Sequence, residues 1–118
     1  MKKHNEFVIS ISLDTVTVAC LDALVYYFDH SRSWVMRKLV ERHYESTIDP
    51  EADYKDELSA EFDFFPKTHR FSILMDELSL DLLDDLVDES ELSHSAVLRG
   101  LVLREFRELV FNLKETIY

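Results

Sequence analysis

The chain has almost no glycine, one residue in 118, and a single cysteine, Cys20. With 47% hydrophobic residues, this scarcity of glycine excludes a disordered tail and indicates an ordered, helix-rich globular protein. A lone cysteine cannot form an internal disulfide, which fits a reducing cytoplasm, and we expect it to be a small core residue rather than a reactive thiol. No apolar run approaches the roughly 20 residues needed to span a bilayer, so no membrane partner is expected.

Basic residues are also in short supply, with 13 Lys and Arg against 24 Asp and Glu, for a net charge of −11. A nucleic-acid-binding protein normally has a basic surface, so this balance argues against that function. The charge is uneven, however. Basic side chains gather at Lys2, Lys3 and His4 and again at Lys67, His69 and Arg70, whereas acidic side chains fill residues 49–63 and 76–91.

Signatures of catalysis and of metal binding are missing. The chain has no glycine-rich loop and no nucleophile elbow. Its five histidines include no pair spaced i, i+4, and no second cysteine is available as a ligand. We therefore expect no enzyme activity, no metal site and no cofactor.

A repeated pattern is the most informative feature that is present. Ser31-Arg32-Ser33 recurs 62 positions later as Ser93-His94-Ser95, and fourteen positions between Ile9 and Glu45 are identical at this offset. Residues 62 positions apart are called equivalent below. Polar positions agree as well as apolar ones, which argues against coincidence between two amphipathic helices. Units this short cannot bury their own apolar faces, so the two copies are expected to pack together.

Each copy is predicted to form a strand and two helices. Apolar and polar residues alternate over residues 8–13 and, less cleanly, over 70–75, the period of a strand with one buried face. Asp14 and Asp76 follow as helix N-caps. The next helix begins at either serine of each Ser-x-Ser pattern. Because a single strand has no partner inside its own copy, the two strands are expected to pair with each other.

These patterns divide the chain into residues 1–46 (first repeat), 47–68 (an acidic linker, partly helical from Asp49) and 69–118 (second repeat). The last helix outlasts its counterpart, because its apolar stripe continues through Phe106, Leu109, Val110 and Leu113. That extension either packs under the linker or makes a contact between chains, through which the protein self-associates.

The order of strand, amphipathic helix, Ser-x-Ser and a helix beginning apolar-apolar-Arg resembles the ribbon-helix-helix DNA-binding family, the Arc and MetJ type. The resemblance covers both repeats and looks like a tandem, single-chain version of what is usually a homodimer. It implies a mainly helical fold with one short two-stranded antiparallel β-ribbon, a tandem ribbon-helix-helix pseudo-dimer.

In that family the ribbon enters the major groove and its outward side chains read base edges. The resemblance assigns this role to Val8, Ser10, Ser12, Arg70, Ser72 and Leu74. Arg70 could contact guanine with two hydrogen bonds, whereas Val8 and Leu74 could only touch a thymine methyl. A phosphate is held at the start of each second helix. The phosphate contacts implied are Ser31, Arg32, Ser33, Ser93, His94 and Ser95, with Lys2, Lys3 and Lys67 beside the ribbon. A solvated ribbon face and simple helix capping are the alternative interpretations.

The chain departs from the family pattern at the turn after each first helix, where the family often has glycine. Here Asp29 and Glu91 stand instead, and because Asp tolerates a left-handed backbone better than Glu, the second turn is expected to take another shape. Both residues also bring negative charge close to the expected phosphate sites. Four arginines at helical spacing are expected to form surface salt bridges: Arg37, Arg42, Arg99 and Arg104.

The resemblance implies a sequence-specific regulator of double-stranded DNA, a transcriptional repressor or a plasmid or viral accessory factor, cytoplasmic and nucleoid-associated. The two strands differ, so an asymmetric site could be read, with Ser10 and Ser12 on one side and Arg70, Ser72 and Leu74 on the other. The alternative is a protein-interaction module with weak or lost DNA binding, antitoxin-like or an acidic mimic of nucleic acid. The net charge of −11 and the acidic turns favour this alternative.

Overall fold

The computed structural model describes residues 6–46 and 66–117. Over these residues the chain forms β1 (Glu6–Leu13), α1 (Thr15–Phe28), α2 (Arg32–Ser46), β2 (His69–Asp76), α4 (Glu77–Ser90) and α5 (His94–Ile117). The predicted mainly helical fold with one two-stranded antiparallel sheet is confirmed. The linker helix predicted from Asp49 lies outside the described residues, and residues 66–68 have no regular secondary structure.

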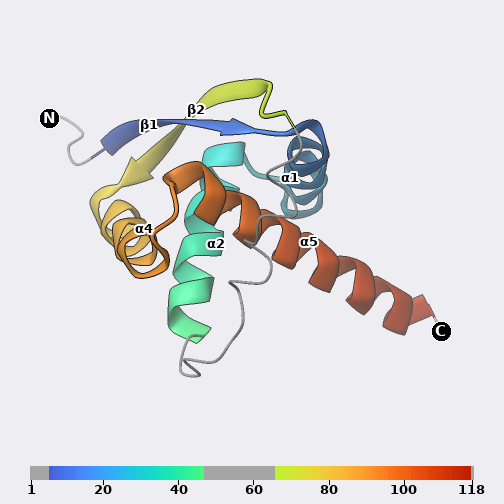
Figure 1. Ribbon diagram of the computed structural model, residues 1–118. Coiled ribbons are helices and arrows are strands. Elements are labelled where there is room, and N and C mark those ends of the chain that lie inside the picture. The colour runs from blue at the N-terminus through green and yellow to red at the C-terminus, as the bar shows by residue number, and fades with distance from the viewer. Residues whose placement is uncertain (1–5, 47–65, 118) are drawn as a thin grey trace, which may run out of the picture.

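The two strands pair with each other inside one chain, and they form a ribbon along one side of the molecule (Figure 1). Ser10 lies opposite Ser72, which is its own equivalent in the second repeat. In an antiparallel pair the register is therefore symmetric about these two serines. The helices all lie on the other side of the ribbon, with α1 and α4 towards its two ends and α2 and α5 crossing beneath it.

The alternating strand pattern places one face of the ribbon in the core. Ile11, Leu13, Ile73 and Met75 are at most 1% exposed, and they pack against apolar residues of all four helices. Burying one such side chain stabilises the fold by about 1.5–3 kcal/mol. The helical part of this core is formed by Val18, Leu21, Leu24, Val35, Met36, Leu39, Val40, Leu83, Leu86, Val97, Leu98, Leu101 and Val102.

Both predicted aspartate caps are present at the starts of α1 and α4. The Asp14 carboxylate accepts from the backbone N–H of Thr17 at 3.0 Å, and the Asp76 carboxylate accepts from that of Ser79 at 2.7 Å. Each bond pairs one backbone donor that would otherwise lack a partner at the helix start, which stabilises a helix by about 1 kcal/mol.

The first serine of each Ser-x-Ser pattern is the N-cap of the second helix. Ser31 Oγ accepts from the backbone N–H of Trp34, and Ser93 Oγ accepts from that of Ala96, both at 3.1 Å. This settles a choice that the sequence left open. The second serine of each pattern is consequently available for another role.

The turns after α1 and α4 have the same shape, so the expectation of a different second turn is wrong. Asp29 has φ 58° and ψ 48°, and Glu91 has φ 61° and ψ 28°, both in the left-handed region. Their backbone N–H groups donate to the carbonyls of Val25 and Val87 and close the last turn of each helix. These closing bonds and the packing of the second helix hold Glu91 in place despite a strain of order 1 kcal/mol.

Not all four recurring arginines are surface residues. Arg42 and Arg104 form the expected ion pairs, each with a glutamate of α5, at 3.0 and 3.6 Å. Arg99, however, is only 1% exposed, because every residue from 97 to 103 of α5 is buried. Its equivalent Arg37 bonds to the backbone of the ribbon rather than to a carboxylate. Arg99 is therefore not the surface residue that was expected, and Arg37 bonds to a backbone carbonyl in place of the expected carboxylate.

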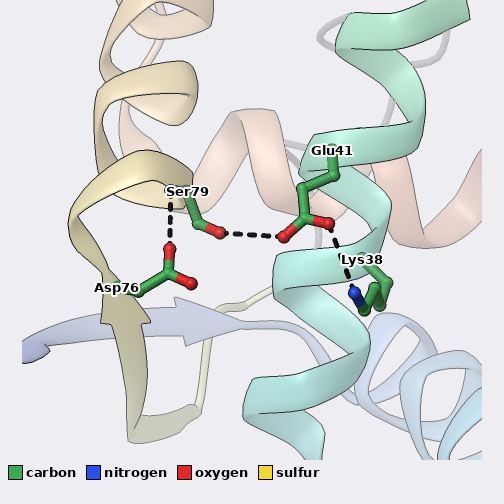
Figure 2. A network of polar contacts seen from close by, with 4 residues as sticks. All are labelled: Lys38, Glu41, Asp76 and Ser79. Carbon is green, nitrogen blue, oxygen red and sulfur yellow. Dashed lines mark hydrogen bonds and ion pairs between the residues drawn. The ribbon is translucent and has the colours of Figure 1, made fainter.

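A polar network joins the start of α4 to α2 (Figure 2). The hydroxyl of Ser79 donates to Glu41 at 3.2 Å, and Glu41 also accepts from Lys38 at 3.3 Å. The backbone N–H of Ser79 is the main cause that lowers the pKa of Asp76 below its usual value. The first repeat has no copy of this network, because the equivalent of Glu41 is Leu103.

The predicted extension of the last helix is confirmed, since α5 has 24 residues and α2 has 15. Its distal part projects from the body (Figure 1) and exposes Val110, Phe111 and Leu113. The linker, one of the two partners predicted for this stripe beside a second chain, lies outside the described residues. No helix within residues 6–46 and 66–117 combines the length and the apolar character that crossing a membrane requires.

Candidate nucleic-acid interface

The outward face of the ribbon carries all six residues that were predicted to read bases: Val8, Ser10, Ser12, Arg70, Ser72 and Leu74. Five of them are exposed and Ser12 is half-buried, in alternation with the core residues of the same strands. The structure therefore brings them together on a single face that the described helices leave uncovered (Figure 1). A ribbon of two strands is narrow enough to enter the major groove.

This face changes in character along its length. Ser12 lies opposite Arg70 at one end, Ser10 lies opposite Ser72 in the middle, and Val8 lies opposite Leu74 towards the other end, beyond which Glu6 lies opposite Asp76. We call the pair Ser12 and Arg70 the polar end, and the pair Val8 and Leu74 the apolar end. Antiparallel pairing places one residue of each strand at every level of the face, so the two expected sets lie side by side and each end combines residues of both strands.

The guanidinium of Arg70 is oriented by the middle of the ribbon. Its Nε donates to Ser10 Oγ at 3.2 Å. Within residues 6–46 and 66–117, its two terminal amino groups have no hydrogen-bond partner and no ion pair. A guanidinium held through Nε presents these donors in the fork geometry that suits two neighbouring acceptors.

The ribbon is fastened to the second helix of each repeat by a pair of equivalent hydrogen bonds. Ser33 Oγ accepts from the backbone N–H of Leu74 at 2.8 Å, and Ser95 Oγ accepts from that of Ser12 at 3.0 Å. Each serine thus binds the strand of the other repeat. Arg37 adds a third bond, because its Nη1 donates to the Leu74 carbonyl at 2.8 Å. Ser33 and Ser95 therefore position the ribbon, whatever else they contact.

The middle residue of each Ser-x-Ser pattern pairs with a carboxylate. Arg32 makes two hydrogen bonds to Asp22, at 2.9 and 3.0 Å, and its guanidinium lies 4.6 Å from the centre of the Phe71 ring. The equivalent His94 Nε2 lies 2.8 Å from Asp84 Oδ1. All four side chains are substantially exposed, and such pairs contribute only about 0–1 kcal/mol. Either pair can therefore open at little cost in free energy.

A hollow of about 410 Å³ lies between the start of α2 and the apolar end of the ribbon. Its polar lining has both signs of charge, because Arg37 and two serine hydroxyls face Glu6 and Asp76. The pKa of Asp76 lies below its usual value, with the Ser79 backbone N–H as the main cause, so this carboxylate is negatively charged at neutral pH as an ordinary aspartate is. An anion at this helix start would meet both attraction and repulsion.

The two flanks of the ribbon differ strongly in charge. Residues 77–91, which span α4 and the turn after it, contain seven acidic side chains and no Lys or Arg. The equivalent residues 15–29 contain only Asp22 and Asp29, with Tyr26 and Tyr27 where the second repeat has Asp88 and Glu89. Of the two phosphate sites that the resemblance implies, the first repeat therefore offers the weaker repulsion.

The remaining expected phosphate contacts are placed only in part. Lys67 is exposed, three residues before Arg70, while Lys2 and Lys3 lie outside the described residues. In the part of the chain that the structure describes, no three His, Cys, Asp or Glu side chains gather as metal ligands would. Comparisons with protein-family models, with curated proteins and with solved structures found no match for this chain.

Sequence reasoning missed the bonds that fasten the ribbon. The signal for them was present, because Ser33 and Ser95, and likewise Arg37 and Arg99, are identical equivalents. Identity at a polar position indicated a shared role, but it could not name the partner. The partners are backbone groups of the other repeat's strand in three of these cases: Ser33, Ser95 and Arg37.

Proposed function

We propose that the chain is a tandem ribbon-helix-helix pseudo-dimer and a sequence-specific regulator that binds double-stranded DNA. It would do so by inserting its intramolecular ribbon into the major groove. The observation that carries this proposal is the ribbon itself, in which Ser10 pairs with its equivalent Ser72 and an uncovered outward face includes Arg70. The setting proposed for this activity is the cytoplasm, in association with the nucleoid.

Two-fold symmetry supports the pseudo-dimer part of the proposal. A homodimer of ribbon-helix-helix chains has a two-fold axis through its ribbon, and the register here is symmetric about Ser10 and Ser72. The bonds from Ser33 and Ser95 to the opposite strands obey the same symmetry. The joined halves make the chain its own partner, as the 62-residue repeat suggested.

Groove chemistry supports the DNA-binding part. A guanine presents two acceptors, O6 and N7, in the major groove, and an arginine fork is the commonest group that binds them. Arg70 offers such a fork, and the hydroxyls of Ser10, Ser12 and Ser72 can donate to or accept from any base pair. Ser31 and Arg32, at the start of α2, are the proposed contacts to a backbone phosphate.

Selection of duplexes from a random pool, at low and at physiological salt, tests this function. A specific binder enriches a motif, and its affinity falls steeply as salt rises. Arg70→Ala should relax the preference at one base pair, at a cost of about 1–3 kcal/mol for the preferred site. Arg42→Ala is the matched control, because it removes the same charge from an exposed site at the α2–α5 crossing. Absence of any enriched motif at low salt would contradict the proposal.

A protein-interaction module is the second candidate, and the acidic residues 77–91 are the observation that favours it. Such a surface suits a basic partner, as a mimic of nucleic acid would. The same selection separates the two candidates, since a module that has lost DNA binding enriches no motif. Charge reversal at Asp88 and Glu89 would lower the affinity for a basic protein partner, whereas it would raise the affinity for DNA.

A further inference from the structure

We infer that the ribbon reads a DNA site of fixed polarity, with a guanine at the polar end and thymine methyl groups at the apolar end. This inference rests on the proposed DNA-binding function and adds the kind of site and its direction. It concerns the outward side chains of one chain, independent of how many chains share a site.

The inference starts from the broken symmetry of the outward face. The backbone register is symmetric about Ser10 and Ser72, so a symmetric sequence would place identical side chains at both ends of the ribbon. Here the equivalent of Arg70 is Val8, and the equivalent of Ser12 is Leu74. The pair of side chains at one end, Ser12 and Arg70, thus differs at both positions from the equivalent pair at the other end, Leu74 and Val8. A symmetric backbone therefore carries an asymmetric reading surface.

The polar end matches a guanine. Arg70 is exposed and is held through Nε by Ser10 at 3.2 Å, which leaves its two terminal amino groups available as donors. O6 and N7 of guanine are the adjacent acceptors that such a fork binds, and no other base offers two acceptors on its major-groove edge. Ser12, opposite Arg70, can bond to the neighbouring base pair.

The apolar end matches thymine. Val8 is 64% exposed and Leu74 is 42% exposed, directly opposite each other on a face that is otherwise polar. Neither side chain can form a hydrogen bond. The donors and acceptors of a G·C pair that contacted them would therefore lose their hydrogen bonds to water and gain none in return, which costs free energy. The C5-methyl of thymine is the one apolar group that the major groove offers.

Leu74 cannot withdraw from this contact, because its backbone is fixed on both sides. Its N–H donates to Ser33 at 2.8 Å and its carbonyl accepts from Arg37 at 2.8 Å. An exposed leucine on a rigid strand is a contact surface that needs no rearrangement before it binds. The apolar end is thus a built feature of the ribbon.

Two single-atom changes in the selected duplex test the two ends separately, with the full chain and one chain bound per duplex. Replacing the guanine by 7-deazaguanine removes N7 and should weaken binding by the wild-type chain about fivefold or more. The same replacement should not weaken binding by the Arg70→Ala variant, which lacks the guanidinium. Replacing the thymines by uracil removes the methyl groups and should weaken binding about threefold per methyl. That second loss should vanish in the double variant Val8→Ala/Leu74→Ala.

A symmetrised ribbon tests the polarity itself. The double variant Val8→Arg/Leu74→Ser gives both ends the same two side-chain types and should select an inverted repeat of the guanine half-site. The wild-type chain should select a non-palindromic stretch instead. The control Val16→Arg/Leu78→Ser makes the same composition change at exposed helix positions off the ribbon and should leave the wild-type motif unchanged. Equal thermal unfolding midpoints establish that the variants fold.

The outcomes are distinguishable. An inverted repeat within the stretch bound by one wild-type chain, or guanine and thymine sensitivity at the same end, overturns the polarity and leaves DNA binding intact. Failure to bind any duplex at low salt overturns the polarity and the proposed function together.

Discussion

At the scale of single residues, Glu91 is held in a backbone conformation that glutamate disfavours. Its φ of 61° lies in the left-handed region, where glycine has no side-chain penalty. We predict that Glu91→Gly raises the free energy of unfolding by about 1 kcal/mol, measured by urea denaturation. Asp29→Gly is the matched comparison, at φ 58°, and should gain less because aspartate tolerates this conformation better.

The same pair of variants separates strain from charge, since each substitution removes one carboxylate from equivalent turns. If the two variants gain equally, relief of repulsion rather than of backbone strain explains the effect. A loss of stability in Glu91→Gly would show that the Glu91 side chain makes a contribution larger than the strain.

His43 should make the stability of the fold depend on pH. Its pKa lies below the usual 6.5, mainly because of burial and further because of the charge on Arg104. The unfolded chain therefore binds the proton more tightly than the folded chain does. Stability from this group is complete above pH 6.5 and is lost as pH falls through the folded-state pKa. Denaturation at a series of pH values should show this loss.

The control for this prediction replaces His43 alone. His43→Gln should flatten the stability profile between the folded-state pKa and pH 6.5, because glutamine does not titrate. His43→Asn, which introduces another side chain that does not titrate, should flatten the profile in the same way. A slope that persists in His43→Gln would place its origin in another group.

At the scale of elements, the serines that fasten the ribbon should be separable from the serines that cap helices. Ser33→Ala and Ser95→Ala each remove the acceptor of a strand N–H, which should destabilise the fold by about 1 kcal/mol. In native-state hydrogen exchange, the exchange rate of the Leu74 amide should rise in Ser33→Ala, and that of the Ser12 amide should rise in Ser95→Ala.

The capping serines provide the matched controls. Ser31→Ala and Ser93→Ala should cost about the same in stability, but they should speed exchange at the starts of α2 and α5 rather than in the ribbon. If all four variants affect the same amides, the ribbon and the helix starts open as one unit and the two roles cannot be distinguished.

The strands and helices of this fold were predictable because local patterns dictate them. Alternation around Ile11 and Ile73 fixed which strand face is buried, and Asp14 and Asp76 marked the helix starts, as the structure has them. Such signals depend on neighbours within a few residues. The elements could therefore be placed to within one or two residues in both repeats.

Register and partners were not predictable in the same way. Alternation fixes the face on which a residue lies but not the residue opposite, so Arg70 could not be paired with Ser12 from the pattern alone. Helical spacing grouped Arg99 with surface arginines, although packing of neighbouring elements buries it. Both depend on tertiary contacts, which a periodicity within one element does not contain.

At the scale of the whole molecule, the net charge of −11 is a poor guide to function because it is an average over unlike surfaces. The six outward positions that were predicted to read bases include Arg70 and no acidic residue, and the ribbon's acidic pair, Glu6 and Asp76, lies beyond them, whereas residues 77–91 carry seven acidic side chains. DNA on the ribbon would contact the first surface and be repelled by the second. The strength of binding is therefore set by the flank as much as by the ribbon.

Making the second flank resemble the first should strengthen DNA binding. Asp88→Tyr/Glu89→Tyr copies the equivalent Tyr26 and Tyr27 and removes two charges at exposed positions near the α4–α5 turn. We predict an affinity gain of about three- to tenfold at low salt, because Asp88 and Glu89 shortly precede Ser93, a proposed phosphate contact, and charges closer than a Debye length interact appreciably. Fluorescence anisotropy with the selected duplex measures it, and the gain should shrink as salt is raised.

Glu105→Gln/Glu108→Gln is the control for this last prediction, since it changes the net charge by the same amount on α5, where Glu105 pairs with Arg42 at the crossing with α2. If net charge alone governs binding, the two double variants gain equally. If the flank governs it, only the change at Asp88 and Glu89 raises the affinity. A gain that persists undiminished above about 0.5 M salt would mean that the tyrosines contact the duplex directly, because screening leaves little electrostatic effect at that ionic strength.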